Sequence, residues 1–376
     1  MNILIISDRY FPDNSGTSIR SIALAEGVVR NGIQVEIATL KEFSDLGLNI
    51  TKEALSFEII NGIQVFRFRS QIEMIFGLIK LIKRKKYHLI HARGPRYGFI
   101  AWILWKLFHI PYILEINYYI EQKNLIKKFL LQRILFSSNR IIVLSNFAVD
   151  WLVNNFKIKK EKIDVIVNGI EIEKFTLSQS DENFLDLCLD NCDVVGYFGT
   201  FHGWQGVFNF VKAAKLICNK NKNVKFLMVG DGPDLNRTIE LSKELEINEK
   251  FIFTGNVSNL MIPKILSKMD IVLIPRTSEL INQIAVPLKI LEAMAMEKAI
   301  VVTPARSLVE VIEDRFTGLI ADYAIEDIVD KVLNLLNNYQ LRKFLGKNAR
   351  NEIMSKYSWS LVSTLLTISY EKAIAK

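Results

Sequence analysis

One segment, residues 270–302, constrains the fold more than any other part of the chain. It begins with a short β-type run, DIVLIP, in which Asp270 is the only charged residue. Pro287 then fixes φ near the helical value, and the residues LKILEAMA that follow predict a helix that is apolar on most sides. Such a helix must be buried in the core. A second strand is expected at residues 299–303.

Two charged residues interrupt this predicted buried helix. Lys289 and Glu292 are three positions apart, so they are neighbours near the start of the helix, and a buried charge is costly without a partner or a ligand. They could pair with each other on an ordinary helix. Alternatively, the amino end of the helix holds a diphosphate, with Lys289 as countercharge and Glu292 accepting two hydroxyl hydrogens from a sugar. The residues alone leave both interpretations open.

Length and composition predict a two-domain globular protein. The chain has 376 residues, and 50% of them are hydrophobic, which excludes a disordered protein. A net charge of +8 suits anionic partners, which include sugar nucleotides, acidic lipid and nucleic acid. The three cysteines show no zinc spacing and leave an odd thiol, which fits a reducing compartment.

The apolar segments predict a cytoplasmic protein. No signal peptide precedes the first strand, which starts at residue 2. The longest apolar run, residues 97–108, is interrupted by Lys106 and is too short to span a bilayer.

The first part of the chain predicts a doubly wound parallel sheet. A strand at residues 2–7, a helix at about 17–30 and a strand at 34–40 follow one another closely. The loop before the helix lacks the G-x-G-x-x-G fingerprint, which argues against a nicotinamide-dependent enzyme. Residues 56–68 predict a hairpin around Asn61-Gly62.

A run of basic residues ends the next predicted helix: Lys80, Lys83, Arg84, Lys85 and Lys86. Cations are favoured at a helix carboxyl end by the helix dipole, which is one interpretation. The other is a surface that docks on anionic lipid. The run lacks the interleaved aromatic residues of a stacking platform, so no nucleic-acid partner is expected.

Several strands deliver polar residues to their carboxyl ends, where ligands bind in such folds. Arg93 follows one strand and is either solvated or meets an anion, and the strand at 112–116 brings Glu115 and Asn117 to the same edge. Asn168-Gly169 predicts a sharp turn before a polar linker at 177–192. In the second α/β part, the small residues after the strand at 193–198 let backbone N–H groups approach an anion.

The segment VPLKILEAMAMEKAIVV, residues 286–302, resembles the donor-site signature of the retaining, two-domain (GT-B) nucleotide-sugar glycosyltransferases of the group 1 (family 4) type. These are related to phosphatidylinositol mannosyltransferases, and the match is to the branch that reads P-L-K-x-L-E-A-M-A. The segments GWQGV, VGDGP and FIFTGNV are similar to further parts of the family pattern and occur in the same order, so the resemblance covers essentially the whole chain.

The resemblance implies an α/β GT-B fold, in which two Rossmann-like doubly wound domains face a cleft. Residues 1–170 are then the acceptor-side domain and residues 171–357 the nucleotide-sugar-binding domain. Residues 358–376 form a helix that crosses back to the N-terminal domain.

The resemblance also assigns site residues. Glu292 corresponds to the glutamate that binds the ribose hydroxyls, and Arg276 and Lys289 are expected to neutralise the diphosphate. Glu115 and Asn117 fit an L-E-x-N pattern where the wider family has a histidine that contacts the sugar. The full donor-binding set is Gly16, Gly199, Thr200, Gln205, Gly230, Val257, Pro287, Leu288 and Glu292. No metal and no cofactor are expected.

Four positions depart from the wider family pattern. Ile284 stands where that family has a second glutamate, and Asn117 where it has the histidine. An arginine near Thr200 and a lysine at Gln205, both of which contact the donor phosphates in the family, are absent.

The expected function is transfer of a sugar, with retention of configuration, from a UDP- or GDP-linked donor to a glycan or a lipid-linked acceptor. Cell-surface polysaccharide or glycolipid synthesis is the expected setting, in the cytoplasm or peripherally on the inner face of the cell membrane. Two alternatives remain. One is a catalytically weak or inactive GT-B subunit that partners an active transferase, and the other is a sugar-nucleotide epimerase.

Overall fold

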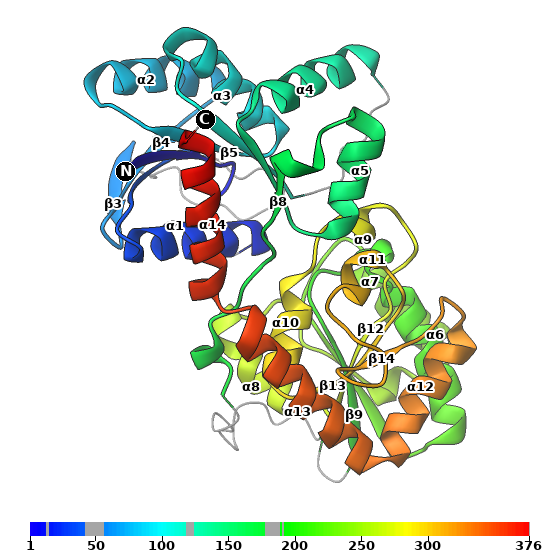
Figure 1. Ribbon diagram of the computed structural model, residues 1–376. Coiled ribbons are helices and arrows are strands. Elements are labelled where there is room, and N and C mark those ends of the chain that lie inside the picture. The colour runs from blue at the N-terminus through cyan, green and yellow to red at the C-terminus, as the bar shows by residue number, and fades with distance from the viewer. Residues whose placement is uncertain (13–14, 42–55, 118–123, 177–188, 190–191, 376) are drawn as a thin grey trace. The chain divides into compact units, whose positions relative to one another are not determined.

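The computed structural model describes residues 1–12, 15–41, 56–117, 124–176, 189 and 192–375 (Figure 1). The chain divides into two compact units: unit 1 consists of residues 1–168 and 359–376, and unit 2 of residues 169–358. The boundaries expected from the sequence, after residues 170 and 357, lie one or two residues from these. Each unit is built on a mostly parallel sheet with helices packed against it. The predicted fold, two Rossmann-like α/β domains, is therefore confirmed.

Unit 1 contains an eight-stranded sheet in the order β3-β4-β2-β1-β5-β6-β7-β8. Its strands are β1 Asn2–Ile6, β2 Gln34–Leu40, β3 Phe57–Ile60, β4 Ile63–Phe68, β5 Leu89–Arg93, β6 Tyr112–Ile116, β7 Arg140–Val143 and β8 Ile163–Val165. All neighbours are parallel except β3 and β4. Those two form the predicted hairpin, with φ of 50° at Asn61 and 79° at Gly62, as an Asn-Gly turn requires.

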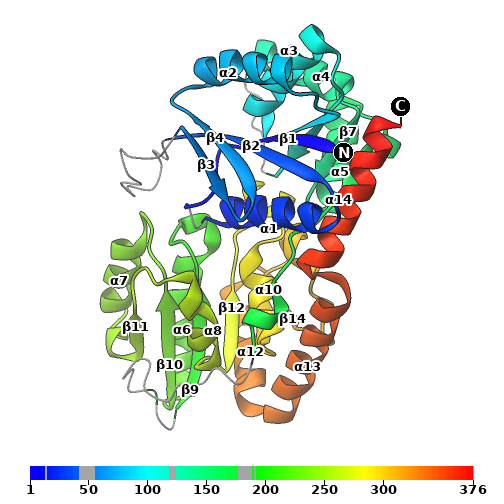
Figure 2. The ribbon, with the colours of Figure 1, turned by 90° about the vertical axis from the view of Figure 1, so that its left-hand side faces the viewer.

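The helices of unit 1 are α1 Gly16–Arg30, α2 Gln71–Arg84, α3 Pro95–Phe108, α4 Leu125–Ser137, α5 Asn146–Phe156 and α14 Trp359–Ile374. Helices α2, α3 and α4 cover one face of the sheet, and α1 and α14 cover the other (Figure 2). A Cβ atom on Gly27 of α1 would lie 2.4 Å from the Cβ atom of Ser363, so the close packing of α14 on α1 requires glycine there.

Unit 2 contains a six-stranded parallel sheet in the order β11-β10-β9-β12-β13-β14. Its strands are β9 Asp193–Phe198, β10 Val224–Val229, β11 Phe251–Phe253, β12 Ile271–Ile274, β13 Ala299–Val302 and β14 Leu319–Ile320. Its α-helices are α6 Val207–Lys220, α7 Leu235–Glu244, α8 Ile262–Ser267, α9 Ile281–Ile284, α10 Leu288–Ala295, α11 Arg306–Val309, α12 Ile325–Asn337 and α13 Tyr339–Lys356. Ile290, Leu291, Ala293 and Met294 of α10 are fully buried, as the apolar pattern predicts.

The connection between β8 and unit 2 differs from the prediction. No turn forms at Asn168-Gly169, and neither residue has a positive φ. The side chain of Asn168 instead accepts a hydrogen bond from Arg20. The predicted linker at 177–192 lies almost entirely outside the described residues. In the part of the chain that the structure describes, no helix has both the length and the apolar character needed to cross a bilayer.

Candidate functional site

The candidate site lies at the carboxyl edge of the sheet in unit 2. Strand β9 is flanked by β10 on one side and β12 on the other, so the connections after these strands leave in opposite directions. Ligands of open parallel sheets bind outside the carboxyl edge at such a switch point. The structure brings five of the predicted residues together here, from the loops after β9, β10 and β12 and from the start of α10. They are Gly199, Gln205, Gly230, Arg276 and Lys289.

Two glycines permit this close arrangement. Gly199 and Gly230 have φ of 127° and 126°, a region that residues with a side chain rarely adopt. A Cβ atom on Gly230 would lie 2.0 Å from the carbonyl oxygen of Gly199, and a Cβ atom on Gly199 would lie 2.7 Å from Nζ of Lys289. The loops after β9 and β10 therefore touch through their backbones, and the lysine amine lies against that contact.

Two cations share one neutral acceptor. The Nζ atom of Lys289 lies 3.1 Å from Oε1 of Gln205 and 3.2 Å from the hydroxyl of Tyr197. The Nε atom of Arg276 lies 3.3 Å from the same Gln205 oxygen. Its Nη1 atom lies 3.4 Å from Oγ of Ser307. The amide of Gln205 therefore fixes the positions of both cations without neutralising either.

Among the described residues, no carboxylate forms an ion pair with Arg276 or Lys289. Burial lowers the pKa of Arg276 to about 10. Burial, followed by the charge of Arg276, lowers the pKa of Lys289 well below its usual 10.5. Two poorly solvated cations without a counterion favour the binding of an anion that can span both.

Glu292 lies about one helical turn beyond Lys289. Burial raises the pKa of its carboxyl to about 7, and the nearby charge of Lys289 opposes this shift. The carboxylate makes no hydrogen bond or ion pair with any described residue, and the residue as a whole is half-buried. Because the amine of Lys289 contacts Gln205 and Tyr197 instead, the two residues do not form the self-contained pair that was one interpretation of the sequence.

The remaining predicted binding residues of unit 2 lie in the loops after β9 and β11 and at the start of α10. Thr200 follows Gly199 and is exposed, and its carbonyl oxygen accepts a hydrogen bond of 2.7 Å from the Tyr197 hydroxyl. Pro287 is the N-cap of α10, and Leu288 is its first residue. Val257 follows β11 and is half-buried. Ile284, where the wider family has a glutamate, is fully buried.

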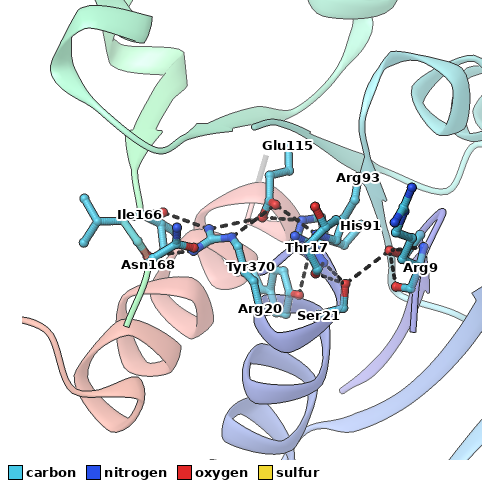
Figure 3. A network of polar contacts seen from close by, with 12 residues as sticks. Arg9, Thr17, Arg20, Ser21, His91, Arg93, Glu115, Ile166, Asn168 and Tyr370 are labelled. Carbon is cyan, nitrogen blue, oxygen red and sulfur yellow. Dashed lines mark hydrogen bonds and ion pairs between the residues drawn. The ribbon is translucent and has the colours of Figure 1, made fainter. Parts of the chain in front are cut away.

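In unit 1, Glu115 lies at the carboxyl end of β6 inside a buried polar network (Figure 3). Its Oε1 atom lies 2.9 Å from Nε of Arg93 and 3.3 Å from Nε of Arg20. Its Oε2 atom lies 3.3 Å from Nη2 of Arg20 and 3.5 Å from Nε2 of His91. Burial by itself would raise the pKa of Glu115, but the two arginines outweigh burial and hold it well below 4.5. Both carboxylate oxygens are therefore occupied.

Asn117 and Gly16 are the other predicted site residues of unit 1. The Oδ1 atom of Asn117, just beyond β6, is buried and has no hydrogen-bond partner among the described residues. Gly16 is the exposed first residue of α1. Arg93, which the sequence left either solvated or facing an anion, is 3% exposed and belongs to the buried network.

Sequence reasoning missed several residues of these clusters. Tyr197, which supports Lys289, lies in the apolar strand β9 and reads as an ordinary core residue. The ring centre of Trp204 lies 5.9 Å from the guanidinium carbon of Arg276. Trp204 belongs to the segment GWQGV, which the sequence singles out, but the sequence does not predict this contact. Arg20 and Tyr370 lie in helices remote in sequence from Glu115, and no local pattern signals their role.

Two family models match most of the chain between them. Glycosyltransferase Family 4 matches residues 14–174, and Glycosyl transferases group 1 matches residues 188–352. An uncharacterized glycosyltransferase of Methanocaldococcus jannaschii is 24% identical, over 96% of both chains. The capsular polysaccharide biosynthesis glycosyltransferase CapM of Staphylococcus aureus is 23% identical, over 78% of this chain and 79% of its own. The crystal structure of Anabaena HepE in complex with UDP superposes with a TM-score of 0.82 at 15% identity, covering 99% of this chain and 100% of HepE.

Proposed function

Since the chain is a glycosyltransferase of the GT-B superfamily, we propose that it transfers a sugar from a nucleoside diphosphate donor to a glycan or lipid-linked acceptor. The donor binds in unit 2, at the carboxyl edge of β9, β10 and β12. The acceptor binds in unit 1, and the configuration of the sugar is retained.

The observation that carries this proposal is the pair of cations around Gln205. When the bond between the anomeric carbon and the diphosphate breaks, negative charge grows on the leaving group and must be stabilised. No described carboxylate forms an ion pair with the guanidinium of Arg276 or the amine of Lys289, and both groups are fixed in place before the charge develops. Such preorganised charges stabilise a developing anion more strongly than mobile ones do. We propose that they supply this stabilisation without a metal ion, so that chelation by EDTA leaves the rate unchanged.

Other residues orient the two substrates. The free carboxylate of Glu292 accepts hydrogen bonds from the ribose hydroxyls, and the backbone of Gly199, Thr200 and Gly230 borders the diphosphate. In a retaining transfer, the acceptor oxygen bonds to the anomeric carbon on the face that the diphosphate leaves, and the proton of the acceptor hydroxyl passes to the diphosphate. Oδ1 of Asn117, which has no hydrogen-bond partner in the part of the chain that the structure describes, is the acceptor atom in unit 1 that we assign to a sugar hydroxyl.

The surface of unit 1 suits an anionic membrane. Helices α2 and α4 lie on the same face of the sheet and expose large apolar side chains: Ile72, Phe76, Leu125, Ile126 and Phe129 are between 57% and 82% exposed. Basic residues stand beside them: Lys80, Lys83, Arg84 and Lys86 are exposed, whereas Lys85 forms an ion pair with Glu36. Apolar side chains among cations favour binding to anionic lipid. We therefore place the enzyme peripherally on the inner face of the cell membrane, where lipid-linked acceptors are accessible.

The donor base and the biological setting are proposals drawn from the relatives. HepE binds UDP, so a UDP-sugar is our first choice of donor over a GDP-sugar. CapM takes part in capsular polysaccharide biosynthesis, and synthesis of a cell-surface polysaccharide or glycolipid is the setting that we propose.

The decisive experiment compares two lysines of unit 2. Lys298, beyond the carboxyl end of α10, is also a half-buried lysine with a lowered pKa, of about 8, and donates to the carbonyl of Ser267. Lys289→Ala is expected to weaken binding of a UDP-sugar, measured by calorimetry, and to lower turnover about tenfold or more, which corresponds to about 1.4 kcal/mol. Lys298→Ala is expected to leave both within about twofold, because it does not face the site.

Other outcomes would select other functions. A wild-type chain that binds no nucleotide, in a thermal-shift screen of UDP, GDP and their sugars, would favour a non-catalytic subunit. Interconversion of the donor sugar with no acceptor present would favour an epimerase. Equal effects of the two lysine substitutions would remove Lys289 from the site.

A further inference from the structure

Arg20 of α1 uses all five of its N–H groups inside unit 1 (Figure 3). Nε and one Nη2 hydrogen bind the two carboxylate oxygens of Glu115, both at 3.3 Å. The second Nη2 hydrogen binds the carbonyl of Ile166 at 2.8 Å, and Nη1 binds the carbonyl of Val167 at 2.7 Å and Oδ1 of Asn168 at 3.3 Å. Arg20 is 2% exposed. A planar guanidinium with every donor engaged allows its partners little freedom.

The three residues that Arg20 holds are the last of unit 1 before the chain enters unit 2. On the far side of the boundary, the N–H of Ile170 donates to the carbonyl of Tyr357 at 2.8 Å, and Ile170 forms a β-bridge with Ser358. The outgoing and returning connections therefore pair with each other in unit 2. Gly169 is the one residue between the Arg20 contacts and this pairing.

The C-terminal helix, which follows the returning connection, approaches the same carboxylate. Tyr370 of α14 lies 2.8 Å, through its hydroxyl, from Nδ1 of His91, whose Nε2 lies 3.5 Å from Oε2 of Glu115. Arg93, bound to Oε1 of Glu115, also donates to the carbonyl of Thr17 and to Oγ of Ser21 in the first turns of α1. Glu115 thus joins the β8 exit, the C-terminal helix and the start of α1 to the centre of the sheet.

We propose that Arg20 and Glu115 are positioning residues of the transfer reaction. They fix both connections between the units to the sheet of unit 1, so that the chain bends at Gly169 and at Ser358–Trp359. Glu115 has no exposed surface and no unoccupied oxygen, so it acts through Arg20 and His91 and does not touch the sugar. This inference rests on the proposed function, because transfer needs a donor held in unit 2 and an acceptor held in unit 1 to meet in a defined orientation.

The test replaces the guanidinium while keeping the charge. In Arg20→Lys a single amine takes the place of the five-donor fork, and the carbonyls of Ile166 and Val167 lose their partners. Hydrogen exchange of residues 163–168, which include the Ile166 amide bonded to Val143, is expected to speed up about tenfold, while β1 and β5 stay protected. Turnover is expected to fall about fivefold or more with the KM for the donor within about twofold, because unit 2 still binds the donor.

Unit 2 offers a matched control. Arg342 donates to one carboxylate, Asp193, and to two consecutive carbonyls, Leu335 and Leu336, at distances of 3.1–3.3 Å. All three contacts are made by Nη1, so Arg342→Lys is a milder change than Arg20→Lys, but it also replaces a guanidinium that binds a carboxylate and two carbonyls, away from both connections. It is expected to alter exchange only around α12 and β9 and to leave turnover and KM within about twofold of the wild type.

A second variant keeps the test decisive if Arg20→Lys does not fold. Tyr370→Phe removes one hydroxyl and no charge, and it is expected to speed exchange in residues 359–374 about threefold, with turnover lowered and donor KM unchanged. The proposal is overturned by unchanged exchange in both variants, by faster exchange with normal turnover, or by faster exchange spread evenly over unit 1. If the wild-type chain transfers no sugar, the proposed function fails, and the exchange measurement alone decides whether Arg20 anchors the connection.

Discussion

Oε1 of Gln205 lies 3.1 Å from Nζ of Lys289, at the start of α10, and 3.3 Å from Nε of Arg276, in the loop after β12, so one amide oxygen orients both side chains. In the wider family that this chain resembles, a lysine is expected at the position of Gln205. An acceptor in its place changes the electrostatics, because the glutamine satisfies one hydrogen of each cation and leaves their charge for a ligand. The site therefore keeps two positive charges in a defined geometry.

Gln205→Glu tests this arrangement with almost no change in shape. A carboxylate at Gln205 would pair with both cations inside the protein, so the folded state should gain stability, and the diphosphate would have to compete with an internal anion. We expect a higher Tm and at least about tenfold weaker binding of a UDP-sugar, equivalent to about 1.4 kcal/mol. Gln205→Ala, which removes the oxygen without adding charge, should weaken binding less. If Gln205→Glu binds the nucleotide as well as the wild type, the cations do not serve the donor.

Because the pKa of Glu292 is raised, we expect the affinity for the donor to depend on pH. Its pKa is raised to about 7 by burial, and only the ionised carboxylate accepts two hydroxyl hydrogens. Affinity for a UDP-sugar, whose diphosphate does not titrate in this range, should rise as the pH increases through 7. At higher pH it should fall again as Lys289, whose pKa is lowered by burial and by Arg276, loses its proton. Calorimetry from about pH 5.5 upward would measure both limbs, of which the rising one should be centred near pH 7. In Glu292→Gln the rising limb should vanish and the falling limb remain.

The same carboxyl should make the fold less stable at neutral pH. The unfolded chain releases this proton near pH 4.5, whereas the folded protein holds it up to about pH 7. Between these values the folded state binds more protons, so its stability falls as the pH rises. Glu292→Gln should therefore raise the Tm at pH 8 by a few degrees, since about 1 kcal/mol shifts the Tm of a domain of this size by about 2–4 °C. An unchanged or lower Tm in this variant would contradict the burial of an unpaired carboxylate.

Much of unit 2 was predictable because its pattern is local. The residues of α10 are apolar on most sides and follow Pro287, so both the helix and its burial could be read from eight consecutive residues. Short apolar runs bounded by glycine located β9 and β10, and the resemblance to the glycosyltransferase family assigned Gly199, Gly230 and Lys289 to one donor site.

The contacts themselves could not be read in this way. Arg20 and Glu115 are 95 positions apart, and Arg20 lies in a helix whose other buried residues are small or apolar. A charged residue in such a helix is usually assigned to the solvent face. The turn predicted at Asn168-Gly169 is absent for a related reason. Local propensity favours a turn there. The side chain of Asn168 instead accepts a hydrogen bond from Arg20, and this long-range contact overrides the local preference.

Because His91 is buried and its pKa is lowered, we expect the folded protein to lose stability in mild acid. Burial lowers its pKa below 6.5, so the imidazole stays neutral between Tyr370 and Glu115 while the unfolded chain takes up a proton. Stability of the wild type should therefore fall as the pH drops below 6.5, by up to about 1.4 kcal/mol per pH unit from this residue. In His91→Gln that part of the slope should disappear in denaturant titrations between about pH 5 and 7.

A comparison of Gly230 with Gly255 distinguishes the effect of an unusual backbone conformation from the effect of a close contact between two loops. Both have positive φ, 126° and 68°, but a Cβ atom on Gly255 meets nothing within 4 Å, whereas one on Gly230 would lie 2.0 Å from the carbonyl oxygen of Gly199. Gly255→Ala should cost only the conformational strain, about 1–2 kcal/mol, and leave nucleotide affinity nearly unchanged. Gly230→Ala must also push the loop after β9 away from Lys289, so it should be less stable than Gly255→Ala and bind a UDP-sugar at least about tenfold more weakly. Calorimetry on the two variants would measure the difference, and equal affinities would mean that the contact between the two loops does not shape the donor site.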